Sequence, residues 1–185
     1  MTKVYITYFV HGTTPDNEND MASGWSDVSL SELGKRQCYE LKKTVKDKKF
    51  DVIVCSDMKR AVETAEIVWG GQVPIVKDNR LRECNLGDLN GAPGKEFNAI
   101  YENCIDSPFP NGESYRQLEK RMRSLLDDMA KNYAGKHVAF VAHQGPQLAL
   151  DVILKGKTWE QAMKEDWRLK VPKEWRPGWD YVLEG

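Results

Sequence analysis

The sequence predicts a layered α/β domain in which helices flank a mostly parallel central sheet. Short apolar, β-branched runs at 4–10, 51–55 and 137–142 are typical of buried strands. Segments with helical spacing of apolar residues separate these runs. A length of 185 residues suits one domain. We therefore expect a single domain that spans residues 1–185.

The first strand, at 4–10, is followed by a predicted helix. We interpret Ser29-x-x-Glu32 as a capping box that begins this helix. Apolar residues then recur at helical spacing, at Leu30, Leu33, Cys38, Leu41 and Val45. This pattern predicts a helix with one face against the sheet.

The second strand, at 51–55, is also followed by a predicted helix. Apolar residues from 58 to 69 trace one face of a helix, which we expect to end at the glycine pair 70–71. A short strand is predicted at 73–76.

The remainder of the chain alternates in the same way. The stretch 78–112 is rich in Gly and Pro, so we expect a long loop with one helix near 95–104. An amphipathic helix is predicted over 115–129. After the third strand, a helix should open with Pro146 at its first position, and a last strand is predicted at 180–183.

Composition excludes several classes of partner. Lys and Arg number 27 and Asp and Glu number 28, so the net charge is close to zero. This balance argues against a protein that binds nucleic acid or membranes through charge. We find neither a membrane-spanning apolar run nor a signal peptide. The cysteines, at 38, 55, 84 and 104, lack C-x-x-C spacing, so we expect a reduced, cytoplasmic protein with no bound metal.

Polar residues follow the predicted strands where ligands bind in open α/β sheets, outside the strand carboxyl ends. His11 follows the first strand, Arg60 lies in the helix after the second, and His143 follows the third. His137 begins its strand and should lie at the opposite edge. These positions favour a common site for His11, Arg60 and His143.

Arg60 lies in the first turn of a helix, where a cation is mildly disfavoured unless an anion binds there too. A solvated arginine would explain the same position. A lone histidine is also more often structural than catalytic. The residue types and positions leave both interpretations open.

An ordered set of motifs resembles the histidine phosphatase superfamily, in its phosphoglycerate-mutase-like branch. The matching segments are Val10-His11-Gly12-Thr13-Thr14-x-x-Asn17, Gly24-Trp25-Ser26-Asp27, Asp51 to Ala65 with Ser56-Asp57-x-x-Arg60-Ala61, Leu81-Arg82-Glu83, Asn111-Gly112-Glu113-Ser114 and Val141-Ala142-His143-Gln144-Gly145. The resemblance runs from residue 4 to about 155 and is weak beyond that point.

The resemblance implies a three-layer phosphoglycerate-mutase-like fold and a phosphohydrolase mechanism that uses no metal or other cofactor. His11 would attack phosphorus and form a phosphohistidine. Glu83 would act as acid and then as base. Arg60 and His143, with help from Asn17, would bind the phosphoryl oxygens of a small phosphorylated substrate.

Two departures from the family pattern concern phosphate binding. Val10 stands where the family has an arginine that binds phosphate, and Gln144 replaces a glycine. The amide of Gln144 could donate a hydrogen bond to phosphate and compensate in part, or the side chain could equally narrow the pocket. With one arginine fewer, the pocket should depend more on protonated His143, so we expect activity to fall on the alkaline side near neutrality.

Three functions compete at this point. A phosphatase on a small phosphomonoester is favoured, because His11, Arg60, Glu83 and His143 are all present. A phosphoglycerate mutase is disfavoured, because 91–112 contains a single basic residue. A binding or regulatory module that has lost most catalysis is the third alternative. The sequence specifies neither the substrate nor the oligomeric state.

Overall fold

The computed structural model describes residues 2–169, 175 and 178–185. Within these residues the main sheet has five strands in the order β4-β3-β6-β1-β7. They are β1 (Lys3–Val10), β3 (Val52–Cys55), β4 (Ile75–Lys77), β6 (His137–Ala142) and β7 (Trp179–Glu184). Neighbouring strands pair in parallel, except that β7 runs antiparallel to β1. The predicted sheet is therefore confirmed.

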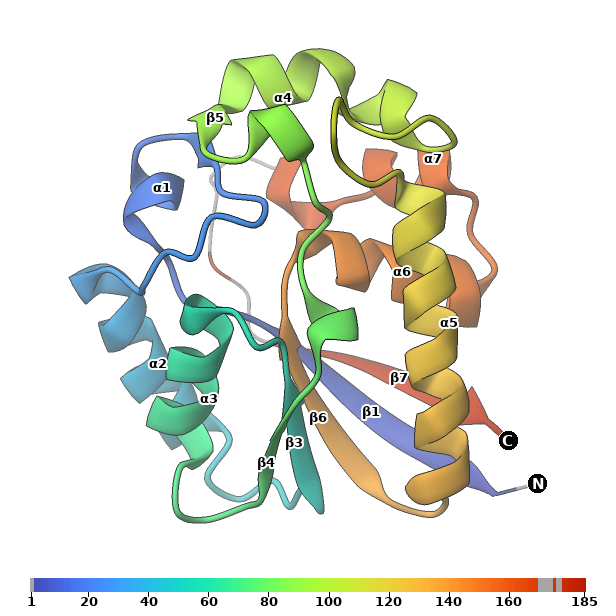
Figure 1. Ribbon diagram of the computed structural model, residues 1–185. Helices are drawn as coiled ribbons and strands as arrows, with labels where there is room; N and C mark the ends of the chain where they lie inside the picture. The colour runs from blue at the N-terminus through green and yellow to red at the C-terminus, as the bar shows by residue number, and fades with distance from the viewer. Residues whose placement is uncertain (1, 170–174, 176–177) are drawn as a thin grey trace.

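Helices cover both faces of this sheet and complete three layers (Figure 1). One face packs against α2 (Glu32–Thr44) and α3 (Lys59–Trp69), and the other against α5 (Tyr115–Asn132) and α6 (Gln144–Lys155), which α7 (Trp159–Lys164) follows. Side chains of β1 alternate between the layers: Tyr8 and Val10 join the core under α5 and α6, and Phe9 joins the core under α2 and α3. The strands are thus buried on both faces, as the near-continuous apolar runs indicate.

Short elements gather beyond the carboxyl ends of the parallel strands (Figure 1). They are α1 (Pro15–Glu18), β2 (Met21–Ala22), β5 (Ala92–Pro93), α4 (Gly94–Ile100) and the 3₁₀ turns Asn79–Leu81, Gly87–Leu89, Tyr101–Cys104 and Trp167–Leu169. β2 and β5 form a small antiparallel pair, which joins the loop after β1 to the long loop before α5. The predicted helix near 95–104 corresponds to α4 and the 3₁₀ turn that follows it.

The predicted start of α2 was wrong. Its N-cap is Ser31 rather than Ser29, and the Ser31 hydroxyl accepts a hydrogen bond from the Gly34 backbone N–H. Leu30 therefore precedes the helix, although its side chain is buried, and Leu33 is 40% exposed. The physical reason is tertiary, because the Ser31 backbone N–H donates to the Thr13 carbonyl and fixes the cap there.

The helix after β6 also begins earlier than predicted. α6 starts at Gln144, so Pro146 is its third residue rather than its first. Pro146 still lies in the first turn, where the missing N–H costs no intrahelical bond. The helix start therefore directly follows His143.

A close backbone approach holds α2 against the loop after β1. A Cβ atom on Gly34 would lie 2.0 Å from the Thr13 carbonyl oxygen, so only glycine fits at this position. The side-chain oxygen of Gln37 also accepts a hydrogen bond from the Thr13 backbone N–H, at 2.9 Å. These contacts fix the backbone that follows His11.

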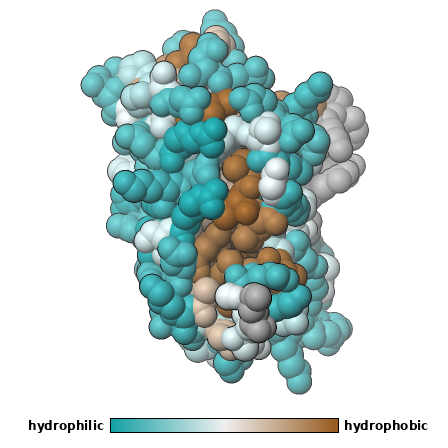
Figure 2. Space-filling model, turned by 90° about the vertical axis from the view of Figure 1, so that its right-hand side faces the viewer, coloured by the Kyte–Doolittle hydropathy of each residue, from teal (hydrophilic) through white to brown (hydrophobic). Residues whose placement is uncertain are grey.

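The face at the right of Figure 1 carries α5, α6 and the outer edge of the sheet at β7. Figure 2 shows this face as hydrophilic at its margins, with a band of hydrophobic side chains along the middle. Partly buried Val152, Ile153 and Leu183 lie at the rim of the core on α6 and β7. No helix among the described residues combines the length and apolar character that a membrane span requires.

Candidate active site

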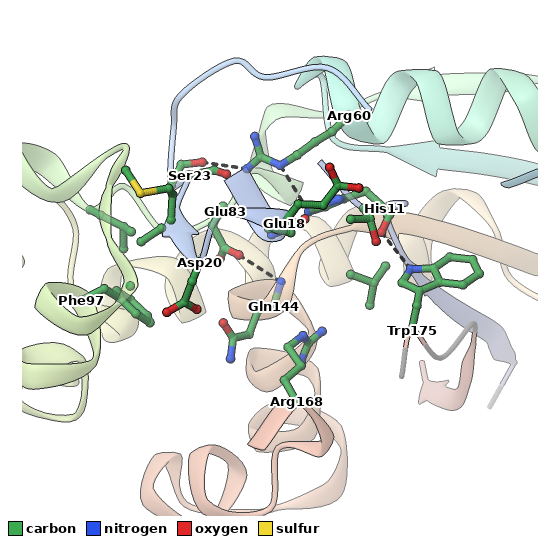
Figure 3. A pocket seen from close by; sticks show the side chains of 18 of the residues that line it. His11, Glu18, Asp20, Ser23, Arg60, Glu83, Phe97, Gln144, Arg168 and Trp175 are labelled. Carbon is green, nitrogen blue, oxygen red and sulfur yellow. Dashed lines mark hydrogen bonds between the residues drawn. The ribbon is translucent and has the colours of Figure 1, made fainter. Parts of the chain in front are cut away.

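A cavity of about 640 Å³ opens where β1, β3 and β6 end. Such a volume is typical of small-molecule sites. Its walls come from the loop after β1, the segment from Glu83 to Tyr101, the start of α6 and the 3₁₀ turn Trp167–Leu169. His11, Arg60 and Glu83 all line it (Figure 3). The sheet edge therefore brings His11 and Arg60 together, as their places after the strands predict, and Glu83, which the motif resemblance indicated, lies in the same cavity.

The contacts of His11 define which ring nitrogen carries hydrogen. Nδ1 lies 2.7 Å from the carbonyl oxygen of Gly12, and Nε2 lies 3.3 Å from Nε of Arg60. A carbonyl oxygen only accepts hydrogen bonds and a guanidinium N–H only donates them. Nδ1 is therefore protonated and Nε2 keeps its lone pair. The ring is a neutral imidazole with an available nucleophilic nitrogen.

Arg60 is fixed by the backbone of the loop after β2. Its guanidinium donates to the carbonyl oxygens of Ser26 and Gly24, at 2.9 and 2.8 Å, and the side chain is 1% exposed. Its position in the first turn of α3 places its cation and the helix N-terminus on the same side of the cavity. Both features favour an anion at this point, which supports a ligand-binding arginine over a solvated one.

His143 is buried directly beside His11. The two ring centroids lie 5.1 Å apart, and His143 is fully buried. Neither ring nitrogen of His143 has a hydrogen-bond partner among the described residues. Buried polar atoms are normally paired, so this imidazole, which lies behind His11 and not in the cavity wall itself, is a candidate ligand-binding group. The Tyr8 hydroxyl holds the backbone of His143 by donating to its carbonyl oxygen and accepting from its N–H.

Glu83 is held by the first turn of α6. One carboxylate oxygen accepts from the backbone N–H groups of Cys84 and Gly145, both at 2.8 Å, and the other accepts from the Gln144 backbone N–H at 3.0 Å. The Glu83 carbonyl accepts in turn from the Trp25 indole, at 2.7 Å, and from the Arg121 guanidinium, at 2.9 Å. Both ends of the residue are thus fixed against the cavity wall.

The two remaining residues predicted to bind phosphate also line the cavity. The side-chain oxygen of Asn17 accepts from the backbone N–H and the hydroxyl of Thr14, and so caps α1. The side-chain amide of Gln144 donates to Asp166. Gln144 therefore holds a carboxylate in this structure, whereas we had expected its amide to face phosphate.

Both active-site imidazoles are poor bases in this environment. Burial, and then the neighbouring Arg60 guanidinium, lower the pKa of His11 from 6.5 to about 3. The same two causes, in the same order, hold the pKa of His143 well below 6.5. The expectation that a protonated His143 supplies charge near neutral pH therefore fails for the free protein. Its titration cannot produce an alkaline loss of activity unless a bound anion first raises its pKa.

The free energy of unfolding should depend on pH because the pKa of His143 is lowered in the folded protein. The folded state keeps this imidazole neutral, and the unfolded chain binds a proton once the pH falls below about 6.5. We therefore expect His143 to lower the free energy of unfolding by about 2 kcal/mol between pH 7 and pH 5. Urea unfolding at several pH values, in wild type and in His143→Gln, measures this contribution. An identical pH dependence in the two proteins would contradict it.

The sequence model of the histidine phosphatase superfamily, branch 1, matches residues 8–173. This chain belongs to that superfamily. The match covers the predicted site residues His11, Arg60, Glu83 and His143, and it extends past residue 155, where the motif resemblance becomes weak. The family assignment therefore rests on most of the chain.

Individual relatives of this chain are named for several activities. An uncharacterized phosphatase, PhoE, from Bacillus subtilis is 36% identical over 134 residues, which are 72% of this chain and 68% of the relative. A 2,3-bisphosphoglycerate-dependent phosphoglycerate mutase from Allorhizobium ampelinum is 29% identical over 88% of this chain and 84% of its own. A solved mycobacterial glucosyl-3-phosphoglycerate phosphatase, in complex with VO3, is 26% identical, with a TM-score of 0.75 over 88% of this chain and 87% of that one.

The candidate site includes residues that the sequence did not indicate. Arg168 and Trp175 line the cavity from the C-terminal segment, where motif resemblance is weak. The Trp175 indole donates to the carbonyl oxygen of His11, at 3.0 Å. Arg121 lies on α5 and reaches Glu83 only through tertiary contact. The only sequence signal in this segment is its tryptophan content, which by itself does not indicate a site residue.

Proposed function

We propose that this protein is a phosphatase that removes phosphate from small phosphomonoesters through a phosphohistidine on His11. The observation that carries the proposal is the neutral His11 ring, whose Nε2 lone pair lies beside the fixed Arg60 cation in a cavity that Glu83 also lines. A nucleophile, a charge for the phosphoryl group and a carboxyl group for proton transfer are thus available together. Relatives named as phosphatases support the same reaction class.

In the first step, Nε2 of His11 attacks phosphorus and the bond from phosphorus to the leaving oxygen breaks. The leaving oxygen takes a proton from the Glu83 carboxyl group. The phosphorylated ring gains positive charge, and the Gly12 carbonyl that accepts the Nδ1 hydrogen stabilises it. In the second step, the Glu83 carboxylate takes a proton from water, and the water oxygen attacks phosphorus. The bond between Nε2 and phosphorus then breaks, and inorganic phosphate leaves.

Arg60, His143 and Asn17 are the proposed ligands of the phosphoryl oxygens. Phosphoryl transfer depends mainly on positioning and on fixed charge, which buried Arg60 supplies without reorganisation. The unpaired ring nitrogens of His143 would gain a partner when a phosphoryl group binds. A phosphoryl dianion would also raise the pKa of His143, so binding should be accompanied by proton uptake.

The residues that line the cavity indicate which leaving groups the substrate can have. Phe97, Tyr101, Tyr115 and Trp167 give them an aromatic character, and Glu18 adds a carboxylate. Such a lining favours a phosphomonoester whose leaving group has an apolar or aromatic part. The substrate panel should therefore include aromatic, aliphatic and amine-bearing monoesters.

A phosphatase screen with and without chelator tests the proposal. We expect hydrolysis of p-nitrophenyl phosphate and of some metabolite monoesters, with the rate unchanged by EDTA. Loss of activity with EDTA and its recovery with a divalent cation would contradict the mechanism. Interconversion of 2- and 3-phosphoglycerate without phosphate release would identify a mutase instead. A folded protein that binds phosphate but hydrolyses none of the panel would support the binding-module alternative.

Gly145→Ala should reduce turnover by displacing Glu83. A Cβ atom at this position would lie 2.5 Å from a carboxylate oxygen of Glu83 and 2.7 Å from Leu118. Both distances are too short, so the carboxyl group must move, and we expect kcat to fall by about 10- to 100-fold. Overpacking should also lower the free energy of unfolding by roughly 1–3 kcal/mol. Kinetics and urea unfolding measure the two effects, and a folded variant with unchanged kcat would show that Glu83 tolerates the shift.

A further inference from the structure

The cationic groups around the cavity are few. The described residues that line it include two arginines, Arg60 and Arg168, and no lysine. Both imidazoles, His11 and His143, have pKa values lowered below their ordinary range and are neutral at pH 7. A phosphoryl dianion in this cavity would therefore meet one fixed charge from Arg60, and a second is available from Arg168 alone among these residues.

We propose that Arg168 is a second phosphoryl-binding arginine, which supplies the charge that Val10 cannot. This inference rests on the proposed phosphatase function and adds a ligand from a different part of the chain. Val10 ends β1, is 6% exposed and belongs to the core under α5 and α6, so it offers only apolar surface at the cavity. Arg168 reaches the cavity from the 3₁₀ turn Trp167–Leu169.

Arg168 and Arg60 approach the site from different directions. In Figure 3, Arg60 and Arg168 lie at opposite sides of the view, with His11, Glu83 and Gln144 between them. Two guanidinium groups in this arrangement could bind different oxygens of one phosphoryl group. Planar guanidinium groups are well suited to that recognition.

The charge of Arg168 already acts on the groups of the site. It contributes to the lowered pKa of His11 and of His143, in each case after burial and Arg60. It also opposes the effect of burial on the pKa of Tyr8, which holds the His143 backbone. The guanidinium is therefore close enough to sense the charge of whatever binds beside the two imidazoles.

Buried partners hold Arg168 in this position. Its guanidinium donates to Asp166, at 2.8 Å, and to the side-chain oxygen of Gln147, at 2.7 Å, and its carbon lies 4.6 Å from the centroid of the Trp167 ring. Asp166 is itself buried, with a side-chain exposure of 2%. These bonds use only some of the guanidinium N–H groups, so others can donate to a ligand. The side chain is thus preorganised for binding.

The hydrogen bonds around Asp166 also assign a positioning role to Gln144. One carboxylate oxygen of Asp166 accepts from Arg168, and the other accepts from the side-chain amide of Gln144. Gln144 therefore acts as a positioning residue that orients Asp166, which in turn orients Arg168. Both departures from the family pattern, at Val10 and at Gln144, then concern the same second charge.

Inhibition by inorganic phosphate is the direct test, measured with p-nitrophenyl phosphate as substrate. We expect Arg168→Met to weaken phosphate inhibition about 10- to 100-fold, the equivalent of one lost charge-assisted hydrogen bond. Arg168→Lys should recover part of this loss, because it keeps the charge. The matched control is Arg123→Met on α5, which also loses a guanidinium paired with a carboxylate, Glu119, and should inhibit like wild type.

The outcomes separate this inference from the proposed function. An active wild type whose phosphate inhibition is unchanged by Arg168→Met overturns the inference and leaves the phosphatase proposal intact. A change confined to substrates with a second anionic group, with unchanged phosphate inhibition, also overturns it. If Arg168→Met does not fold, Arg168→Gln replaces it, with folding checked by circular dichroism. A wild type with neither activity nor phosphate binding fails the proposed function itself.

Discussion

Replacement of His11 by alanine is expected to abolish turnover and the phosphoenzyme together. The proposed nucleophile is Nε2 of His11, and no other imidazole nitrogen of the described residues both lines the cavity and keeps its lone pair beside Arg60. Loss of a nucleophile typically lowers kcat by on the order of 10³-fold or more. Rapid quench with a ³²P-labelled monoester should trap acid-labile, alkali-stable phosphate on wild type and none on His11→Ala.

The control for this substitution is His137→Gln. His137 begins β6 at the opposite edge of the sheet, as predicted, and its Nε2 lies 2.9 Å from the Thr7 hydroxyl. We expect this variant to form the labelled intermediate at the wild-type rate. Undiminished turnover in a folded His11→Ala protein would refute the assigned role, as would a label that persists in it.

The elements of the fold were predictable where local pattern and tertiary environment agree. The strand at 137–142 was predicted with the bounds that β6 has, because parallel strands buried on both faces are short, continuous apolar runs. The start of α2 was mispredicted, because Ser29 offers the fuller local motif, a capping box with Glu32, whereas Ser31 is fixed as the cap by a hydrogen bond to Thr13. A local motif cannot reveal which of two caps meets a distant backbone carbonyl.

The candidate site was predictable in the same partial way. Strand ends alone indicated His11, Arg60 and His143, because parallel strands deliver the residues that follow them to one edge. Glu83 comes after β4 but beyond the 3₁₀ turn Asn79–Leu81, so its distance from a strand end gave no signal and only its motif indicated it. Arg168 lies in a segment of weak resemblance, and its relation to the cavity depends on partners that no spacing rule connects.

The ionisation of the site was the least predictable feature. The ordinary pKa of histidine suggests that His143 titrates near neutrality. Complete burial beside Arg60 lowers its pKa instead, and the sequence contains neither fact. With both imidazoles neutral, Arg60 and Arg168 are the cations that the described lining of the cavity offers to an anion.

Glu83→Gln is expected to separate the two chemical steps. The substitution keeps the size of the side chain but removes the group that protonates the leaving oxygen and later activates water. General acid–base catalysis contributes about 10²- to 10⁴-fold, so turnover of alkyl phosphomonoesters should fall by that factor. p-Nitrophenol leaves readily without a proton, so p-nitrophenyl phosphate should still phosphorylate His11. Hydrolysis of the phosphohistidine stays slow for every substrate, because the attacking water still needs a base. Stopped-flow absorbance should therefore show a burst of p-nitrophenol followed by a slow steady state, with phosphohistidine accumulating.

A structural role of Glu83 must be distinguished from this chemical role, because its carboxylate also accepts three backbone N–H groups. Glu113→Gln is the matched control. The Glu113 carboxylate accepts from the Asn85 backbone N–H in the same loop, at 2.9 Å, and from the Arg121 guanidinium, but Glu113 does not line the cavity. Loosening the loop through Glu113 should lower activity modestly for all substrates and produce no burst. If Glu83→Gln behaves in the same way, with equal losses for p-nitrophenyl and alkyl phosphates and no phosphohistidine, Glu83 positions the loop and another group transfers the proton.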